Sequence, residues 1–358
     1  MKTARMLAIL VLALGFAVGV ANADFTFGEP TNLGAPVNSE DRDFGPSISA
    51  DGLSLYFDST RPGGFGNKDL WVTMRATTED PWGEPVNLGS TVNGAYADCV
   101  PSITGDGLSL FFHCDRPDGF GKRDIWLTTR PTINDTWGEP VNLGPPINTS
   151  YRESGVCISA DGLTLYFVSD LPGGYGYGDI WVAMRPTTDD DWDEPINLGP
   201  TINTSISDLA TSISADDLIL FLGSSRSGGA GGNDIWMSKR PTKEHAWGTL
   251  VNLGPTVNSP NTDYQPNISP NGRTLYFTSE RPDGFGGSDL WQAPVIPIVD
   301  LNGDGIVDAA DMCIVVDNWG TDNPLCDIGP MPWGDGIVDV QDLIVLAEHL
   351  FEEIPPVE

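Results

Sequence analysis

The chain has 358 residues, of which 42 are glycine and 29 proline, and it carries 50 acidic residues against 18 lysines and arginines. This composition fits many short strands joined by tight turns and excludes a fold of long helices. The formal net charge of −32 repels phosphate backbones and anionic lipids. Nucleic acid and membrane surfaces are therefore excluded as expected partners, and cations are favoured.

Residues 1–23 have the pattern of an export signal. Two basic residues precede the apolar run Met6–Val20, and the small-x-small triplet Ala21-Asn22-Ala23 follows it. The mature chain is expected to begin near Asp24 and to be secreted, with the periplasm or the cell surface as alternative destinations. No later stretch approaches the roughly 20 apolar residues that a membrane span requires, so none is expected.

A triplet of Asp, Leu or Ile, and Trp returns five times along the chain. The copies begin at Asp69, Asp124, Asp179, Asp234 and Asp289. Every interval is 55 residues (124−69, 179−124, 234−179 and 289−234). A spacing that never changes indicates five copies of one supersecondary unit with loops of equal length.

Each copy predicts four strands. An aromatic-Gly-x-x-x-Asn-Leu-Gly segment precedes a strand with a central isoleucine, a tight turn, a strand with three consecutive large apolar residues, and a glycine-rich bend into the triplet strand. In the first copy these features stand at Phe27, Ile48, Asp51-Gly52, Leu55-Tyr56-Phe57 and Arg61–Gly66. Asp-Gly between apolar runs predicts a hairpin, and three apolar residues in a row indicate a sheet that is buried on both faces.

Four strands per copy, buried on both faces and repeated in one direction, predict a β-propeller. The pattern Ser-Ile-Ser-Ala-Asp-Gly-Leu-x-Leu-Tyr-Phe-x-Ser at Ser47–Ser59, nearly repeated at Cys157–Ser169, resembles the WD40-like (PD40) repeat of TolB-type proteins. The resemblance covers residues 25 to about 295 and implies an all-β, five-bladed and monomeric propeller. Since the first segment precedes the first blade, Phe25–Gly34 is expected to supply the outer strand of the fifth blade and to close the ring.

A short acidic loop follows the propeller of residues 24–293. Pro294 and Pro297 are expected to break the strand pattern and to form a linker, residues 294–299. Loop positions 1, 3, 5, 9 and 12 then carry oxygen-bearing side chains, position 6 is Gly305, and position 7 offers a backbone carbonyl. The expected ligands are Asp300, Asn302, Asp304, Ile306, Asp308 and Asp311. This arrangement predicts a Ca²⁺ site.

A second copy of the loop lies 31 residues further on, with Asp335, Asp339 and Asp342 as expected ligands. Met331 and Trp333 stand where its positions 1 and 3 should be. Two alternatives stay open: Asp327 reaches in around an insertion, or the second site is incomplete.

Each loop leads into a segment with the apolar periodicity of a helix, so the two helices are expected to pack on each other. Asp in place of Glu at position 12, one helix per loop and the duplication make residues 300–352 resemble a type I dockerin, with residues 353–358 as a tail. The resemblance implies Ca²⁺ and a cohesin-like protein partner. It assigns partner contacts to loop positions 10 and 11, which are Ala309, Ala310, Val340 and Gln341. The alternative is a Ca²⁺-stabilised terminal module without a partner.

One acidic residue recurs before the central isoleucine of each copy. These residues are Asp43, Asp98, Glu153, Asp208 and Asp263. They could form a ring of carboxylates that binds cations or catalyses glycoside hydrolysis. Repetition favours a structural role instead, because it gives all five the same environment, whereas catalysis needs carboxylates with different roles.

Other candidate sites are weaker. Asp58 and His113 break the repeat, and the sequence favours scattered surface positions for them. The triplet tryptophans are expected in the core, while the aromatic residues of the bends, such as Phe65, are better placed to contact a ligand. Cys99 and Cys114 are expected to face each other across a hairpin, with Cys313 and Cys326 close together near the C-terminus and Cys157 left over.

These features predict a secreted, non-catalytic propeller that binds a glycan or a protein and is attached by a Ca²⁺-dependent dockerin-like domain to a cohesin-bearing partner. The first alternative is a secreted carbohydrate-active enzyme, since five-bladed propellers and dockerins both occur among polysaccharide-degrading proteins. The second is a TolB-like envelope component with a periplasmic protein partner. No catalytic residue is assigned from the sequence.

Overall fold

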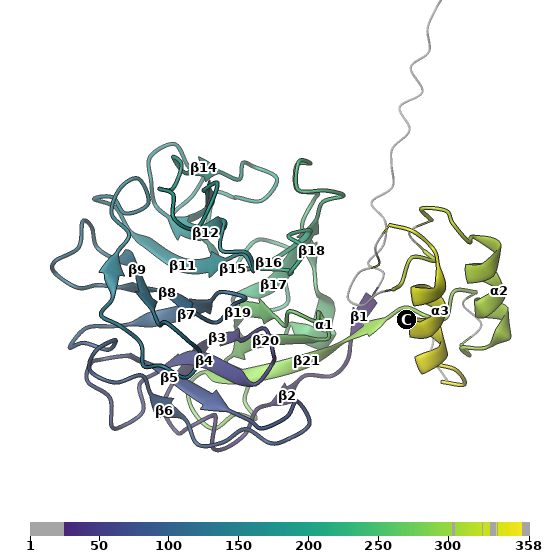
Figure 1. The fold of residues 1–358 in the computed structure, drawn as a ribbon, viewed down its shortest axis with the longest axis horizontal. Coiled ribbons are helices and arrows are strands. Elements are labelled where there is room, and N and C mark those ends of the chain that lie inside the picture. The colour runs from purple at the N-terminus through teal and green to yellow at the C-terminus, as the bar shows by residue number, and fades with distance from the viewer. Residues whose placement is uncertain (1–24, 303–304, 324, 330–333, 335, 353–358) are drawn as a thin grey trace, which may run out of the picture.

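A computed structural model describes residues 25–302, 305–323, 325–329, 334 and 336–352. The expected export signal and the C-terminal tail lie outside these residues. The described chain is mostly β, with one short helix, α1 (Gly254–Val257), within the strand region and two further helices near the C-terminus (Figure 1). No helix in the described part is long and apolar enough to cross a membrane.

Five antiparallel sheets follow one another along the chain (Figure 1). Blade 1 comprises β3 (Asp43–Ile48), β4 (Ser54–Ser59), β5 (Asp69–Met74) and β6 (Val86–Asn87). Blade 2 comprises β7 (Cys99–Ile103), β8 (Ser109–Cys114), β9 (Asp124–Thr129) and β10 (Val141–Asn142). Blade 3 comprises β11 (Glu153–Ile158), β12 (Thr164–Ser169), β13 (Asp179–Met184) and β14 (Ile196–Asn197). Blade 4 comprises β15 (Asp208–Ile213), β16 (Ile219–Ser224), β17 (Asp234–Lys239) and β18 (Val251–Asn252).

Blade 5 joins the two ends of the propeller sequence. It comprises β19 (Asp263–Ile268), β20 (Thr274–Ser279) and β21 (Asp289–Pro297), and the N-terminal strands β1 (Phe25–Phe27) and β2 (Thr31–Asn32) both pair with β21. Asn32 lies opposite Trp291, as Asn87 lies opposite Trp71 in blade 1. The innermost strands of neighbouring blades pack against each other around the whole ring. The prediction of a five-bladed propeller is therefore confirmed.

β21 extends beyond Ala293, where the sequence pattern placed the end of the strand. Both prolines of the expected linker lie in this extension, which β1 covers along Val295–Pro297. Proline lacks an N–H donor but keeps its carbonyl, and Gly28 N–H donates to the Pro294 carbonyl at 2.9 Å. The pairing of β21 with the N-terminal segment therefore continues past the two prolines, because their carbonyls can still accept hydrogen bonds.

The repeated triplet owes its fixed spacing to a polar network. In blade 1, Asp69 is buried and accepts hydrogen bonds from Phe65 N–H (2.5 Å), Gly66 N–H (2.9 Å) and Asn87 Nδ2 (2.8 Å). The carboxylate therefore joins the glycine-rich bend to the next outer strand. A Cβ on Gly66 would overlap the Tyr96 carbonyl of the following blade, which is why the bend needs glycine there.

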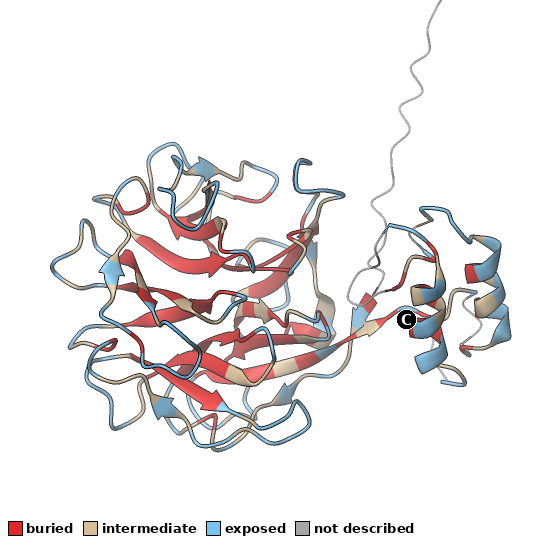
Figure 2. Cartoon of the chain, viewed as in Figure 1, coloured by how far each residue is buried: buried red, intermediate tan, exposed pale blue. Residues whose placement is uncertain are grey.

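Both faces of each blade are buried (Figure 2). Leu55, Tyr56 and Phe57 are consecutive and all at most 3% exposed, so alternate side chains enter the packing on either side of the sheet. Trp71 is also buried, as are the other four triplet tryptophans. The predictions that both sheet faces are covered and that the triplet tryptophans belong to the core are confirmed.

The described C-terminal residues form a small helical cluster with its own core. α2 (Ala309–Asp317) and α3 (Val340–Glu348) contact each other, and their buried residues pack with the segments that precede them. The core consists of Val299, Val307, Val315, Cys326, Ile328, Val338, Val345 and Leu346. These side chains come from both loop-helix units, so each unit completes the other's core.

The prediction that Cys99 and Cys114 face each other across their hairpin is wrong. Cys99 lies opposite His113 in the strand register, so the neighbouring Cys114 points to the other face of the sheet. The two thiols accordingly belong to different apolar clusters. All five cysteines, including Cys313 and Cys326, are free thiols in the structure.

Candidate functional site

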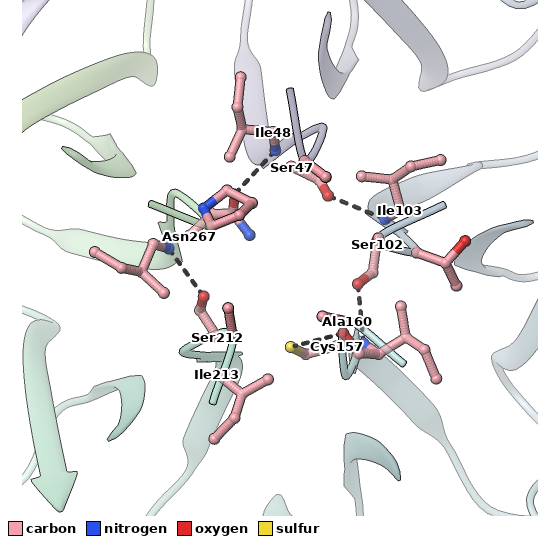
Figure 3. A pocket seen from close by; sticks show the side chains of 16 residues that line it. Ser47, Ile48, Ser102, Ile103, Cys157, Ala160, Ser212, Ile213 and Asn267 are labelled. Carbon is pink, nitrogen blue, oxygen red and sulfur yellow. Dashed lines mark hydrogen bonds between the residues drawn. The ribbon is translucent and has the colours of Figure 1, made fainter. Parts of the chain in front are cut away.

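The central channel has two mouths that differ in their lining. At one mouth, which we call the serine mouth, each inner strand presents a small polar side chain: Ser47, Ser102, Cys157, Ser212 and Asn267 (Figure 3). Four of them bond the backbone N–H of the isoleucine on the next blade, for example Ser47 Oγ with Ile103 N–H at 3.1 Å. The cavity here measures only about 60 Å³. The serine mouth therefore serves chiefly to link the blades.

The opposite mouth, where the inner strands begin, holds a larger cavity of about 280 Å³. We call it the cationic mouth because Lys68, Arg123 and Arg152 all line it. Asp115 is its one carboxylate-bearing lining residue, and the polar residues Asn67, His113, Ser154 and Gln265 complete the hydrophilic part of the wall. A positive cavity is thus built into a strongly acidic chain.

Asp58 and His113 bridge neighbouring blades beside the cationic mouth. Val100 N–H of blade 2 donates to Asp58 Oδ2 at 3.0 Å, and Gly155 N–H of blade 3 donates to His113 Nδ1 at 3.3 Å. Both side chains are at most 5% exposed. The expectation that they are scattered surface positions is therefore wrong: this strand position faces the inner strand of the next blade, and Thr278 Oγ1 likewise accepts the Gly45 N–H at 3.0 Å.

Burial controls the protonation of this pair. It raises the pKa of Asp58 above its ordinary value, although Lys68 Nζ at 3.6 Å and the Val100 N–H oppose the shift. Burial, reinforced by Arg123, Lys68 and Arg152, holds the pKa of His113 well below its ordinary value. His113 is therefore a neutral ring at pH 7, and because Nδ1 accepts a hydrogen bond, its proton resides on Nε2.

The acidic column occupies buried structural positions. Its five members are fully buried, and four of them pair with an arginine of their own blade, as Asp98 does with Arg116 at 2.8 Å. Asp98 also accepts the Gly94 N–H at 2.8 Å. Leu171 replaces the arginine in blade 3, where Glu153 instead accepts bonds from Thr149 and Ser169. These contacts favour the structural role over a cation-binding or catalytic ring.

The aromatic residues of the bends lie on the surface, in contrast to the triplet tryptophans. Phe65, Phe120, Tyr175 and Phe285 are each about half exposed. They belong to outer bends, and none of them lines the cavity of the cationic mouth. They are available for contacts but do not form part of that site.

A third hollow, of about 490 Å³, lies between blades 5 and 1. Its two arginines already have partners. Arg75 stacks on Trp82 at 4.3 Å and donates to the Gly52 carbonyl, and Arg273 lies 3.5 Å from Glu348. The hollow is larger than the cationic mouth, but both of its arginines are held by neighbouring groups.

The first acidic loop turns sharply at Gly305. Asp300 Oδ2 accepts the Gly305 N–H at 2.9 Å, and Gly305 has the positive φ of 88° that the sharp turn needs. Asp308 caps α2 by accepting the Ala310 N–H, and Asp311 is fully buried beneath the loop. Asp304 lies outside the described residues.

The second loop repeats this geometry with Asp327 at position 1. Asp327 Oδ2 accepts the Gly336 N–H at 2.7 Å, and Gly336 again has a φ of 88°. The separation is nine residues (336−327) instead of five (305−300), so the loop contains an insertion of four. Gly329 then takes position 3, because its N–H bonds Asp342 Oδ1 as the N–H of Asn302 bonds Asp311 Oδ1.

Of the two alternatives for the second loop, these contacts favour Asp327 reaching in around an insertion. Asp335 and the inserted residues 330–333, including Met331 and Trp333, lie outside the described part. Among the described residues, no group of three or more His, Cys, Asp or Glu side chains is arranged as a metal site. The residue types nevertheless fit a hard cation, because the sequence of each loop carries several carboxylates around a glycine of positive φ.

The expected partner-contact positions lie at the beginnings of the two helices. Ala309, Ala310 and Val340 are exposed, and Gln341 is partly exposed. Ala309 forms an exposed stripe with Cys313 and Val316 on α2, and Val340 forms a matching stripe with Ile344 and Ala347 on α3. Each stripe follows the i, i+4, i+7 spacing, at 309, 313 and 316 and again at 340, 344 and 347, so it runs along one helix face.

No family profile and no curated protein sequence matches this chain. Among solved structures, the α-L-arabinofuranosidase PaAbf62A from Podospora anserina, determined in complex with cellotriose, is 10% identical over 76% of this chain and 96% of that one, with a TM-score of 0.51. The shared property is the fold. A thermostable family-43 glycoside hydrolase is 14% identical over 73% of this chain and 91% of that one, with a TM-score of 0.47.

TolB from Acinetobacter baumannii is 14% identical, with a TM-score of 0.45. The match covers 75% of this chain and 63% of TolB, so this chain spans less than two thirds of TolB's length. Identities this low carry no residue-level correspondence.

Sequence reasoning missed the three cations of the cationic mouth. Lys68 and Arg123 share one repeat position, whose other members are Gly178, Asn233 and Ser288. Arg152 belongs to a second position, shared with Arg42, Ala97, Ser207 and Thr262. The sequence feature that could have indicated this site is that the residue type at these two positions varies strongly among the five copies, whereas the neighbouring positions are nearly the same in every copy.

Proposed function

We propose that this chain is an exported, non-catalytic propeller that binds a ligand at the cationic mouth and is attached to a partner by a Ca²⁺-binding, dockerin-like tail. The propeller would be the recognition module, and the tail would determine which assembly it joins. The proposal has two halves: attachment through the tail and ligand binding by the propeller. The attachment half is supported by the similar geometry of the two C-terminal loops. The binding half is supported by the side chains that line the cationic mouth.

The attachment half rests on the correspondence between Asp300 with Gly305 and Asp327 with Gly336. Ca²⁺ would be held by Asp300, Asn302, Asp304, the Ile306 carbonyl, Asp308 and Asp311 in the first loop, and by Asp327, Asp335, Asp339 and Asp342 in the second. The ion would neutralise several carboxylates at once and so stabilise the two-helix core. Gly329 offers no side-chain oxygen at position 3, so we expect the second loop to bind Ca²⁺ more weakly than the first.

The partner would dock on the matching stripes of α2 and α3. The stripes are apolar and exposed, which is the composition expected for the centre of a protein interface. Their equivalence means that either helix can present a similar face to a cohesin-like protein. A tail that served folding alone would not need two such faces.

The attachment half is tested by capture from the secreted fraction of the source organism with the immobilised mature chain, with and without EDTA. A partner retained with Ca²⁺, released by EDTA and lost when both Val340 and Ile344 are changed to Asp supports the proposal. Arg185→Gln on the propeller is the matched control and should retain the partner. Capture that is unaffected by EDTA and by the α3 changes contradicts it.

The binding half rests on how the carboxylates are used. The acidic column is buried in ion pairs or hydrogen bonds, so its members are not free to act as the acid and base of a hydrolase. Arg123 and Arg152, which form no ion pair among the described residues, line the cationic mouth together with the polar side chains of Asn67, Ser154 and Gln265. A propeller whose carboxylates stabilise the blades and whose mouth collects cations is suited to binding.

A glycoside hydrolase is the second candidate, favoured by the fold shared with the arabinofuranosidase and by one residue. Asp58 is a buried carboxyl with a raised pKa next to the cationic mouth, which suits a general acid. Asp115 would have to be the second carboxylate. Release of sugar by the wild-type chain, lost in Asp58→Asn and in Asp115→Asn, would establish this candidate. A TolB-like envelope role is the third, and it predicts a periplasmic protein partner but gives no role to the tail.

A further inference from the structure

The basic side chains of the propeller are mostly consumed by its architecture. Four arginines pair with the acidic column: Arg61, Arg116, Arg226 and Arg281. Four more stack on the first-segment tryptophans: Arg75, Arg130, Arg185 and Arg240. Arg123 and Arg152 do neither, and within the described part of the chain neither guanidinium forms an ion pair. They are therefore two arginines that line the cationic mouth without a paired carboxylate among the described residues.

These two arginines start from adjacent backbone positions. Arg123 and Arg152 form a parallel bridge between blades 2 and 3, so two positive side chains leave the backbone side by side at the cationic mouth. Paired like charges are destabilising unless an anion lies between them. Nε of Arg152 is buried and has no hydrogen-bond partner among the described residues. A buried donor without an acceptor is costly, and a bound acceptor would remove that cost.

The remaining wall offers both donors and acceptors. His113 contributes a neutral ring with an Nε2 proton, Asn67 and Gln265 contribute amides, Ser154 contributes a hydroxyl and Asp115 contributes a carboxylate. A simple inorganic anion has no use for acceptors such as Asp115. A ligand with several hydroxyls uses both kinds, because each hydroxyl donates one hydrogen bond and accepts others.

Three tyrosines directly precede residues at or next to this cavity in the sequence. Tyr96 and Tyr151 directly precede the lining residues Ala97 and Arg152, and both are about 40% exposed. Tyr177 directly precedes Gly178, next to which the Arg152 guanidinium lies, and is 80% exposed. Aromatic faces with a polar tip suit a ligand that is apolar on one face and hydroxylated at its edges.

We propose that the cationic mouth binds an acidic sugar, with the carboxylate of a uronic acid residue held between Arg123 and Arg152 and the ring hydroxyls bonded by the surrounding polar side chains. This inference rests on the proposed binding role of the propeller and names its ligand class. Planar guanidinium groups bind carboxylates through two parallel hydrogen bonds, which explains arginine at both positions. The cavity of about 280 Å³ lies near the lower end of small-molecule sites and accommodates a single sugar ring.

The test measures binding of digalacturonate to the full mature chain by isothermal titration calorimetry, at one fixed Ca²⁺ concentration in every arm. Digalactose is the neutral comparison, and a tetrapeptide with a free C-terminal carboxylate is the competing class. We expect digalacturonate to bind at least about tenfold more tightly than either. Arg152→Gln and Arg123→Gln should each weaken binding about tenfold or more, whereas Arg273→Gln, which removes the same charge far from the cavity, should not.

Several results overturn the inference. They are equal affinity for digalacturonate and digalactose, tighter binding of the peptide, absence of binding to all three probes, or unchanged affinity in a correctly folded Arg152→Gln variant. Circular dichroism of each variant establishes folding. Binding of digalactose that ignores both arginine changes refutes the acidic-sugar assignment while leaving the binding role intact. Hydrolysis of any probe refutes the binding role itself.

Discussion

The acidic column contains its own control, because one of its five members has lost its arginine. In blade 2 the pair is Asp98 with Arg116, and the arginine also donates to the Val92 carbonyl and lies over Trp126 at 5.0 Å. In blade 3 the pair is replaced by Glu153 and Leu171, and the carboxyl is held by Thr149 N–H (3.1 Å), Thr149 Oγ1 (2.7 Å) and Ser169 Oγ (3.1 Å). The same neutralising change should therefore have opposite effects at the two positions.

Asp98→Asn leaves the guanidinium of Arg116, whose side chain is 14% exposed, without its counter-charge. Breaking a buried ion pair from one side costs about 3–5 kcal/mol, because the surviving charge stays desolvated. We expect the free energy of unfolding at pH 7 to fall by about that amount. The substitution is close to isosteric, so the loss reports charge and hydrogen bonding more than packing.

Glu153→Gln should instead be neutral or stabilising at pH 7. Burial raises the pKa of Glu153 above its ordinary value of about 4.5, with Asp124 acting in the same direction. A raised folded-state pKa means that the contribution of Glu153 to stability is complete below the unfolded value and is lost as pH rises through the folded value. The variant should thus match the wild type below pH 4.5 and gain on it as pH rises.

The assay is urea denaturation of the full chain between pH 4 and 8, followed by near-ultraviolet circular dichroism of the buried tryptophans. The result that refutes the reasoning is a loss in Glu153→Gln at pH 7 equal to that in Asp98→Asn. A stability difference between wild type and Glu153→Gln that shrinks with rising pH would refute it as well.

Two further predictions concern the ends of the chain. A chain that begins at Ala35 lacks β1 and β2, exposes the edge of β21 and loses the buried Phe25. We therefore expect a lower melting temperature and self-association in size-exclusion chromatography. An unchanged melting temperature would contradict a closing role for these strands. Asp300→Asn and Asp327→Asn should each abolish one of two Ca²⁺-binding events in calorimetry, whereas Met331→Ala should keep both. Loss of a site in Met331→Ala, or two sites in Asp327→Asn, would contradict the insertion.

The propeller could be predicted from the sequence because the same pattern of strands and turns occurs in five copies. The 55-residue interval counts the blades, and the triplet marks a strand whose Asp, exemplified by Asp69, closes the same hydrogen-bond network each time. The Ca²⁺ site at Asp300 stays a prediction, and it could be made because its expected ligands are close together in the sequence. The role of Asp327 could be stated only as an alternative, since an insertion breaks the spacing that a pattern depends on.

The cationic mouth could not be predicted, because its residues are scattered over all five blades. Arg123 and Arg152 lie 29 positions apart and meet only when blades 2 and 3 pack (152−123). Asp58 and His113 resemble irregular surface residues in the sequence, yet their strand position faces the inner strand of the next blade. Variation among otherwise uniform repeats is the signal that points to such a site.

The central claim, that the propeller binds without catalysis, is tested most directly by incubating the wild-type chain with a panel of acidic and neutral polysaccharides. Retention on the polysaccharide and the release of reducing ends are measured in the same samples. The account predicts retention by an acidic polysaccharide, weakened in Arg152→Gln, with no reducing ends above those of the enzyme-free control. Reducing ends that accumulate with the wild type and disappear in Asp58→Asn would contradict it.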